Sequence, residues 1–313
     1  MTALSIIIAA HDAAAYLGRT LERLAAELPA GADVEVLLID DASTDATGAI
    51  AAEQAGRHGW LRVLRVEFRN VGKVRQFGVQ QARGRHITFL DSDDAFMDGA
   101  LAWLLATLAA QQPDALLAPL REVSDADRAE PIAADLAVRP ISTAAAIDAF
   151  LDHRRIQGHL IGKCFSRALL ASCEIPGLSA YEDLAVLPEL LLGAQRIVLA
   201  SDAFYLYLKR PGSLSSRARG WPRLAEQVAA LERVERALAP WVPAHRLGVF
   251  WVELAHALSA TPDGAALLPD HPAIGRRVAA LPLWRFLLSP SVRTSLKRKL
   301  LKLGALRRAA GAR

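Results

Sequence analysis

Short runs of apolar residues alternate with longer amphipathic stretches through the first 120 residues of the chain. The apolar runs occupy residues 4–10, 34–40, 61–67, 86–92 and 114–120. The stretches between them are predicted to be helical over 13–27, 45–57, 73–83 and 98–111. Continuous apolar strands that alternate with helices are typical of a parallel sheet with both faces covered. Right-handed crossovers then predict an α/β fold with a doubly wound, mostly parallel sheet.

This alternation ends near residue 120. Residues 121–140 are charged and contain proline, which indicates an excursion or a hairpin. Farther on, helices are predicted near 142–153 and over 181–195, a short strand enters a helix within 160–172, and strands are predicted at 196–200 and 204–210. From residue 221 the pattern is helical, and 213–222 has the composition of a linker. We therefore expect one domain over 1–215, with halves 1–120 and 121–215, and a helical extension over 216–313.

The composition is that of a globular protein, with 52% hydrophobic and 22% charged residues. No apolar run approaches 18 residues, and His11 and Asp12 interrupt the N-terminal apolar run too early for a signal peptide. Only two cysteines occur, Cys164 and Cys173, which favours two reduced thiols. These features predict a cytoplasmic protein and suggest no nucleic-acid partner.

Polar residues follow each of the first four predicted strands. His11 follows the first, Asp40 and Asp41 end the second, the basic pair Lys73 and Arg75 follows the third, and acidic residues 91–94 follow the fourth. Ligands of doubly wound sheets bind beyond the carboxyl ends of the strands. Capping accounts for one such strand end, with Ser43 or Asp45 at the start of the next helix. Several polar ends at one edge predict a site.

The stretch Asp91-Ser92-Asp93-Asp94 contains three carboxylates in four positions. Asp91 and Asp93 lie two residues apart, so an extended backbone places both on the same side. Carboxylate oxygens suit Mg²⁺ or Mn²⁺, which also bind substrate phosphates. A hydrated turn is the alternative interpretation. Asp93 is the predicted metal ligand, Asp91 binds the metal or a ribose, and Asp94 starts the next helix.

Two further groups belong with this edge. Lys73 and Arg75 open a predicted helix, where a basic pair could contact a diphosphate or form a solvated face. Glu182 and Asp183 open another helix, where acidic residues favour the helix dipole or supply a general base.

The chain resembles a family 2 glycosyltransferase with the GT-A fold. The resemblance is strong over 3–95 and moderate over 155–215, and the order and spacing of its motifs make it specific. The matching stretches are SIIIAAHDAAAYL, VLLIDDASTDATG, NVGKVRQFGVQQARGRHITFLDSDDAF, GKCFSRALL, YEDLAVLPELL and YLYLKRPGSLS. The resemblance implies a Rossmann-like sheet, a nucleotide-sugar donor that is UDP-linked, a Mn²⁺ or Mg²⁺ ion, and transfer to an acceptor hydroxyl with inversion. The implied acceptor is a lipid-linked or growing cell-surface glycan.

The resemblance also assigns roles by position. Asp183 would be the base and Glu182 a partner for the acceptor, while Asp93 and Asp91 would hold the metal. The positions on the donor side are Ala9, His11, Asp40, Asp41, Lys73, Arg75, Asp91 and Ser92. At the end of the first strand, Ala9, Ala10 and His11 stand where the family usually has a proline and a small polar loop.

The last 23 residues, 291–313, contain eight Lys or Arg and no acidic residue. Val292, Leu296, Leu300, Leu303 and Leu306 fall near one helical face. Such a helix suits an anionic membrane surface, which would place the enzyme peripherally at the cytoplasmic face of the inner membrane. Packing of the apolar face on the protein, with a solvated basic face, is the alternative.

Three other functions are open at this point. A haloacid-dehalogenase-type phosphatase also carries Asp-x-Asp at a strand end, but on its first core strand, whereas three strand–helix units precede Asp91 here. A nucleotidyltransferase would require a glycine-rich basic loop after the first strand, and AAHDAAAYLG is not one. A catalytically inactive, membrane-associated scaffold is the third alternative, and the complete acidic set argues against it.

Overall fold

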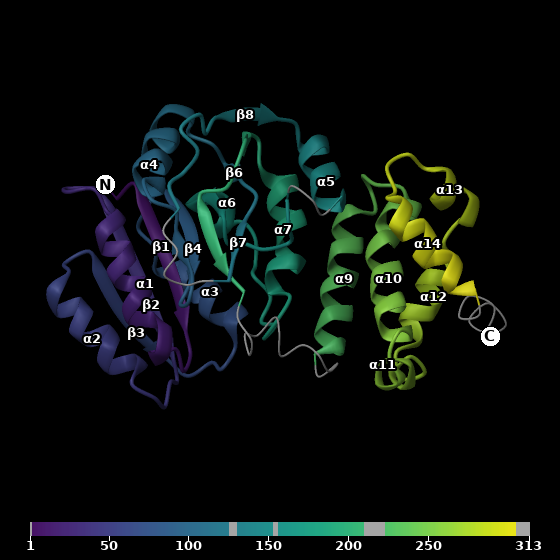
Figure 1. Cartoon of the computed structure of the whole chain (residues 1–313). Coiled ribbons are helices and arrows are strands. Elements are labelled where there is room, and N and C mark those ends of the chain that lie inside the picture. The colour runs from purple at the N-terminus through teal and green to yellow at the C-terminus, as the bar shows by residue number, and fades with distance from the viewer. Residues whose placement is uncertain (1, 125–129, 153–155, 210–222, 305–313) are drawn as a thin grey trace. The chain divides into compact units, whose positions relative to one another are not determined.

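The computed structural model describes residues 2–124, 130–152, 156–209 and 223–304 (Figure 1). The chain divides into two compact units, Met1–Ile147 with Arg154–Arg210, and Asp148–His153 with Pro211–Arg313. The predicted boundary at 215/216 lies outside the described residues. We call the units the sheet unit and the helical unit.

The sheet unit is built on eight strands in the order β3-β2-β1-β4-β9-β6-β10-β8. The first four strands run parallel, as the alternating pattern predicts, whereas β9 runs antiparallel to both β4 and β6, and β8 runs antiparallel to β10. The strands are β1 (Leu4–Ala10), β2 (Val34–Asp41), β3 (Leu61–Val66), β4 (His86–Asp91), β6 (Ala115–Leu117), β8 (Val138–Ile141), β9 (Lys163–Ser166) and β10 (Ile197–Ala200).

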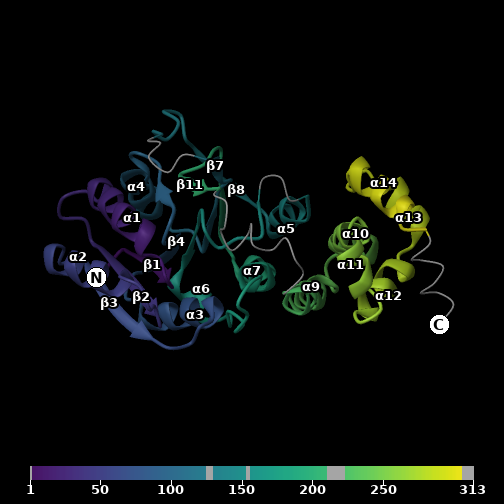
Figure 2. The same ribbon diagram turned by 60° about the horizontal axis from the view of Figure 1, so that its bottom comes forward.

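Helices cover both faces of this sheet, so its central strands are buried throughout. Helices α1 and α4 lie on one face and α3 and α6 on the other (Figure 2). Ile6, Ile7 and Ile8 of β1 are at most 1% exposed, which explains the uninterrupted apolar run. The helices of this unit are α1 (Ala14–Glu27), α2 (Thr47–Arg57), α3 (Val71–Gln81), α4 (Ala100–Gln111), α5 (Thr143–Asp152, whose residues from Asp148 on belong to the helical unit), α6 (Arg167–Ala171) and α7 (Glu182–Gly193).

A second sheet of three short strands lies beside the fourth strand end. Its order is β5-β11-β7, formed by β5 (Ala95–Phe96), β11 (Tyr205–Leu208) and β7 (Arg121–Val123). The sequence predicts a strand at 204–210 but no separate sheet, because strands of two or three residues carry no periodic signal. This sheet brings Tyr205 next to the acidic stretch that follows β4.

The helical unit contains the end of α5 and six further described helices, of which α10 is central and buried. Helix α10 packs against α9, α11, α12, α13 and α14, and its Trp251 is 2% exposed. The helices are α9 (Leu224–Leu238), α10 (Ala244–Ser259), α11 (Pro262–Leu267), α12 (Pro272–Ala280), α13 (Leu283–Leu288) and α14 (Thr294–Lys302). None of the helices within the described ranges has both the length and the apolar character needed to cross a bilayer.

The basic C-terminal stretch forms α14, whose apolar face is buried. Val292, Leu296, Leu300 and Leu303 are each at most 3% exposed, and α14 packs on α10. Of the two interpretations of this stretch, the structure therefore supports packing on the protein for these four residues. Leu306 lies outside the described residues.

Candidate active site

The carboxyl ends of β1, β2 and β4 meet at one edge of the large sheet. In the parallel register, Asp40 of β2 pairs with Ala10 of β1, and Asp91 of β4 pairs with Ala9. The two acidic strand ends therefore flank the end of β1. This is the clustering of polar strand ends that the sequence predicts.

The backbone turns sharply as it leaves three of these strands. Asp12, Ala42 and Arg69 follow β1, β2 and β3 with φ of 46°, 55° and 48°. Residues with side chains seldom adopt this left-handed conformation, and where they do the surrounding structure must hold it. The loops that border the site are therefore fixed by specific contacts.

The carboxylates of Asp40 and Asp41 supply such contacts. Asp40 accepts hydrogen bonds from Arg65 Nη1 at 2.9 Å and from the Ser43 backbone at 3.1 Å. Asp41 is 4% exposed and accepts hydrogen bonds from the consecutive backbone N–H groups of residues 68, 69 and 70. Both carboxylates thus shape the loops, and contact with a uracil or ribose stays a prediction for them.

The first strand end carries Ala9 and His11. His11 is half exposed, and its Nδ1 donates a hydrogen bond to the carbonyl of Asp41 at 2.6 Å, since a carbonyl oxygen can only accept.

The two residues predicted to cap α2 make different contacts. Asp45 accepts a hydrogen bond from the N–H of Thr47, the first residue of α2, whereas Ser43 accepts one from the N–H of Asp12.

Helix α3 begins against the segment that precedes α7. Asn70 caps α3 by accepting a hydrogen bond from Lys73 N–H, and it donates one to the carbonyl of Gly177. A Cβ at Gly72 would lie 2.1 Å from the carbonyl oxygen of Pro176, so only glycine allows this approach. The side chain of Lys73 is exposed at this helix start, where it was predicted.

Arg75 occupies the centre of the site and is not part of a solvated basic face. It is 7% exposed, donates to Asp91 Oδ1 at 2.8 Å, and forms a second, short ion pair with Glu182. Arg75 therefore connects the end of β4, Asp91, with the start of α7, Glu182, which are 91 residues apart in the chain. Burial raises the pKa of Glu182 above its ordinary value, and the neighbouring Asp183 and Asp91 add to the shift, although Arg75 opposes it.

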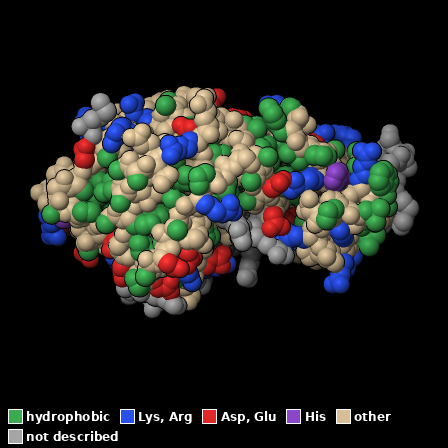
Figure 3. Space-filling view, turned by 90° about the horizontal axis from the view of Figure 1, so that it is seen from above, with side chains coloured by type: hydrophobic (Ala, Val, Ile, Leu, Met, Phe, Trp, Pro, Cys, Tyr) green, Lys and Arg blue, Asp and Glu red, His purple; other side chains and the backbone are tan. Residues whose placement is uncertain are grey.

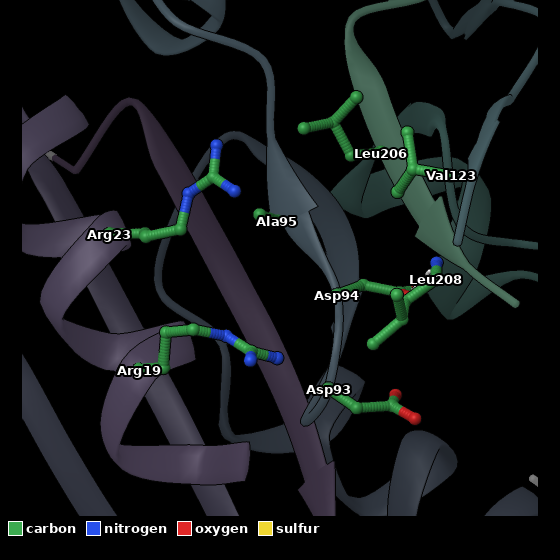
Figure 4. A pocket seen from close by; sticks show the side chains of 8 residues that line it. All are labelled: Arg19, Arg23, Asp93, Asp94, Ala95, Val123, Leu206 and Leu208. Carbon is green, nitrogen blue, oxygen red and sulfur yellow. Dashed lines mark hydrogen bonds between the residues drawn. The ribbon is translucent and has the colours of Figure 1, made fainter. Parts of the chain in front are cut away.

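The acidic stretch after β4 separates into groups with different environments (Figure 4). Asp94 is 3% exposed and accepts hydrogen bonds from Tyr205 Oη and from the Leu208 N–H, both at 2.8 Å. The prediction that Asp94 starts the next helix is wrong, because its carboxylate instead joins β11 to the end of β4. In Figure 4 the side chains of Asp93 and Asp94 are separate, with the carboxylate of Asp93 lower in the view.

Ser92 contributes its backbone here. Its carbonyl accepts a hydrogen bond from the hydroxyl of Thr20, which reaches the carbonyl of Asp94 as well. Helix α1 therefore supports the turn that carries Asp93.

This turn fits a hard divalent cation that is shared with a phosphate ligand. Asp91 and Asp93 provide carboxylate oxygens on one turn, and both are partly exposed. Within the described ranges, no three His, Cys, Asp or Glu side chains enclose a metal position by themselves. Mg²⁺ and Mn²⁺ do not need such a cage, since one or two carboxylates plus substrate phosphates suffice.

Asp183 follows Glu182 in the first turn of α7. Its Oδ1 accepts a hydrogen bond from the N–H of Leu184 at 2.7 Å, and its Oδ2 lies 3.1 Å from Nδ1 of His159. Burial opposes its ionisation, but the hydrogen bond and charge of His159, with Arg75, outweigh burial and lower the pKa of Asp183. Asp183 is therefore a carboxylate at neutral pH, as a general base must be.

Two residues of this site were not identified from the sequence. His159 contacts Asp183, and Lys163 is completely buried in β9. Burial lowers the pKa of Lys163 to about 7, although the charge of Asp183 opposes the shift. A lysine inside the apolar stretch LIGKCF was a usable signal, because a charge is costly there unless it has a partner. His159 has no comparable pattern around it.

Residues 5–169, more than half of the chain, match the model described as glycosyl transferase family 2. The matched stretch contains every strand end described above and the short strand β9, and it ends before Glu182 and Asp183.

Relatives with assigned names are similar over different lengths. The poly(ribitol-phosphate) beta-N-acetylglucosaminyltransferase TarS of Staphylococcus aureus (strain Mu50) is 29% identical over 252 residues, which are 79% of this chain and 42% of TarS. The succinoglycan biosynthesis protein ExoO of Rhizobium meliloti is 29% identical over 222 residues, 67% of this chain and 62% of ExoO. The putative glycosyltransferase EpsH of Bacillus subtilis is 34% identical over 92 residues, 29% of this chain and 26% of EpsH. The chain thus spans less than half the length of TarS and EpsH.

Solved structures share the fold. Residues 1–349 of S. aureus TarS, crystallised with UDP-GlcNAc, give a TM-score of 0.68 at 22% identity, over 98% of this chain and 89% of that one. The mannosyltransferase PcManGT of Pyrobaculum calidifontis, in complex with GDP-Man and Mn²⁺, gives a TM-score of 0.50 at 16% identity, over 97% and 86%. These similarities confirm the predicted α/β fold with a mostly parallel sheet and a helical C-terminal region.

Proposed function

The chain belongs to glycosyl transferase family 2, and on that premise we propose that it transfers a sugar from a UDP-linked donor to an acceptor hydroxyl with inversion. The observation that carries the proposal is the double contact of Arg75. Its guanidinium binds Asp91 beside the Asp-x-Asp turn and Glu182 beside Asp183. This double contact supports the proposal that the predicted donor side and the predicted base side form one site.

The donor would bind at the edge where β1, β2 and β4 end. Ala9, His11, Asp40 and Asp41 border the position of the nucleoside, the last two by holding the loops around it. Lys73 is exposed at the start of α3, where a diphosphate would benefit from its charge and from the helix dipole. TarS was crystallised with UDP-GlcNAc, which supports UDP as the carrier.

Asp93 and Asp91 would hold Mn²⁺ or Mg²⁺, and Ser92 lies between them on the turn. When bound, the ion supplies positive charge that stabilises the departing diphosphate. The carboxylate chemistry of the turn supports this assignment, and PcManGT was solved with Mn²⁺. Arg75 fixes the orientation of Asp91 by its ion pair.

The transfer step exchanges one bond for another. The acceptor oxygen forms a bond to the anomeric carbon from one side while the bond from that carbon to the diphosphate oxygen breaks on the opposite side, which inverts the configuration. The electron pair of the broken bond leaves with the diphosphate. Asp183 takes the proton of the acceptor hydroxyl, and Glu182 is placed to contact the acceptor.

The acceptor would be a lipid-linked or growing cell-surface glycan. TarS is named for poly(ribitol-phosphate) and ExoO for succinoglycan biosynthesis, and these two names support a glycan or polymer acceptor. We also propose peripheral attachment of the helical unit to an anionic membrane at its cytoplasmic face. Because the apolar face of α14 is buried, attachment would use exposed residues of the same unit, where basic and hydrophobic side chains lie together (Figure 3). The exposed hydrophobic and basic residues of this unit include Trp284, Leu288, Arg298, Leu301 and Lys302.

The proposal is tested with a panel of nucleotide-sugars and Mn²⁺. We expect one UDP-sugar to raise the thermal midpoint with Mn²⁺ and to release UDP faster than without the ion. Asp93→Asn should lose both effects, whereas Glu53→Gln, which changes an exposed carboxylate on α2, should keep them. If no nucleotide-sugar shifts the midpoint or is turned over, the inactive-scaffold alternative is favoured.

A further inference from the structure

His159 lies in a short segment between helix α5 and strand β9. Ile156, Leu160 and Ile161 of this segment are each at most 2% exposed, so apolar contacts anchor it on both sides of the histidine. The side chain of His159 itself is 43% exposed. The segment is therefore held in place by buried apolar residues, and the side chain of His159 extends from it toward solvent.

Two glycines fit this segment tightly against its neighbours. A Cβ at Gly158 would lie 2.7 Å from Cδ1 of Leu184, at the start of α7. Gly162 has a φ of +64°, and a Cβ there would lie 2.3 Å from the side chain of Leu120. The backbone on either side of His159 is thus set against fixed partners, and one of them is the residue that follows Asp183.

The ring of His159 is oriented by two contacts. It stacks on Tyr207 of β11, with ring centroids 6.2 Å apart and an angle of 26° between the planes. Its Nδ1 lies 3.1 Å from Oδ2 of Asp183, and because an ionised carboxylate can only accept, Nδ1 carries a proton in both the neutral and the charged ring. Nδ1–H then donates to Asp183.

The carboxylate of Asp183 receives one donor on each oxygen. The N–H of Leu184 binds Oδ1 at 2.7 Å, and His159 binds Oδ2. The backbone donor alone leaves the carboxylate free to rotate about its bond to Cβ, whereas two donors from different segments fix its plane. Each oxygen has a second lone pair, and the orientation of the plane decides where those lone pairs point.

We propose that His159 is a positioning residue for Asp183, which orients the carboxylate so that a lone pair meets the acceptor hydroxyl. The inference rests on the proposed function, since it refines the role of the base. His159 does not exchange a proton with the substrate in this scheme. It acts through Asp183, while the proton of the acceptor passes to the carboxylate as the new C–O bond forms.

The first test uses two substitutions with opposite expectations. His159→Ala removes the donor, and kcat should fall about ten- to a hundredfold, as expected for the loss of one hydrogen bond to a charged group. The KM for the donor sugar should stay within about twofold. Asn places an amide N–H near the position of Nδ1, so His159→Asn should restore most of kcat. His58→Ala, on the far end of α2, serves as the matched histidine control.

The second test does not require turnover. In ¹⁵N NMR spectra of the whole protein, recorded at alkaline pH so that the ring is neutral, His159 should carry its proton on Nδ1, and in Asp183→Ala it should shift to the Nε2–H form. The inference is wrong if wild type shows the Nε2–H form, if His159→Ala keeps the wild-type kcat, or if His159→Asn is as slow as His159→Ala. If the wild type transfers no sugar but shows the Nδ1–H form that depends on Asp183, the proposed function fails while the pairing stands.

Discussion

Arg75 and Glu182 form a buried ion pair that joins helix α3 to the first turn of helix α7. The side chain of Arg75 is 8% exposed and that of Glu182 is 4% exposed. A buried pair of this kind adds little stability over an apolar pair, but its loss on one side leaves an uncompensated charge in the interior. Because Arg75 also binds Asp91, the same guanidinium determines the geometry of two groups that the proposed reaction uses.

Arg75→Ala should destabilise the sheet unit by about 3–5 kcal/mol, since Glu182 would then be buried without its partner and must either keep an uncompensated charge or take up a proton. Arg57→Ala is the matched control, because it removes an exposed pair with Glu53 one helical turn away and should cost about 0.5 kcal/mol or less. Urea unfolding with tryptophan fluorescence measures both. Equal midpoints for the two variants would contradict the importance of the buried pair.

Adjacent residues Asp93 and Asp94 should respond in opposite ways to substitution. Asp94→Ala leaves the Tyr205 hydroxyl and the Leu208 N–H without their acceptor, which should cost about 1–3 kcal/mol for each buried group. Asp93→Ala should keep the unfolding midpoint and lose Mn²⁺-dependent turnover. Thermal unfolding and UDP release distinguish the two roles. If Asp93→Ala lowered the unfolding midpoint while Asp94→Ala lost only Mn²⁺-dependent turnover, the two assignments would have to be exchanged.

Asp183→Asn should reduce sugar transfer at least about a hundredfold, because an amide cannot accept the acceptor proton. The fold and the Mn²⁺-dependent binding of the donor should be retained, since the amide fits the same space and the donor contacts lie elsewhere. Transfer rates and donor-induced thermal shifts measure the two properties separately. Transfer near the wild-type rate in a folded Asp183→Asn protein would exclude Asp183 as the base.

The lowered pKa of Asp183 predicts a pH dependence of stability with a definite sign. A carboxyl group whose pKa is lower in the folded than in the unfolded state stabilises the fold above the unfolded value, near 4, and loses this effect as the pH falls through the folded value. The stability difference between wild type and Asp183→Asn should therefore be largest at pH 5–7 and shrink below about pH 4. Urea unfolding across this range measures it, and a difference that does not change with pH would contradict the lowered pKa.

Leu300 and Leu301 of α14 are neighbours with opposite environments. Leu300 is completely buried and Leu301 is 60% exposed. Leu300→Ala should cost about 2–5 kcal/mol, whereas Leu301→Ala should leave unfolding unchanged and weaken flotation with anionic vesicles. Deletion of 291–313 is a poor test of membrane attachment, because it removes four buried side chains of the helical unit. A second variant combines Trp284→Ala with Leu288→Ala. If this double variant and Leu301→Ala both bind vesicles as well as the wild type does, this surface is not the site of attachment.

The sequence predicts the large sheet well and the small one poorly. The apolar runs at 4–10, 34–40, 61–67 and 86–92 correspond to β1–β4, because burial on both faces leaves a long and uninterrupted signal. The antiparallel strand β9 was identified only as a short strand, and the three-stranded sheet was not expected. Its strands are short, and their stability comes from partners more than seventy residues away in the chain, which no local pattern encodes.

For the candidate site, the sequence determined which residue types lie at the carboxyl edge of the sheet. Strand period and parallel pairing are enough to bring residues such as Asp40 and Asp91 to the end of β1. Only the tertiary structure decided how each carboxylate is used: Asp41 and Asp94 bind backbone N–H groups, Asp91 and Glu182 share Arg75, and Asp183 accepts a hydrogen bond from His159. The physical reason is that an ionisable side chain takes its role from its burial and its nearest charges and donors, and these come from segments far apart in the chain.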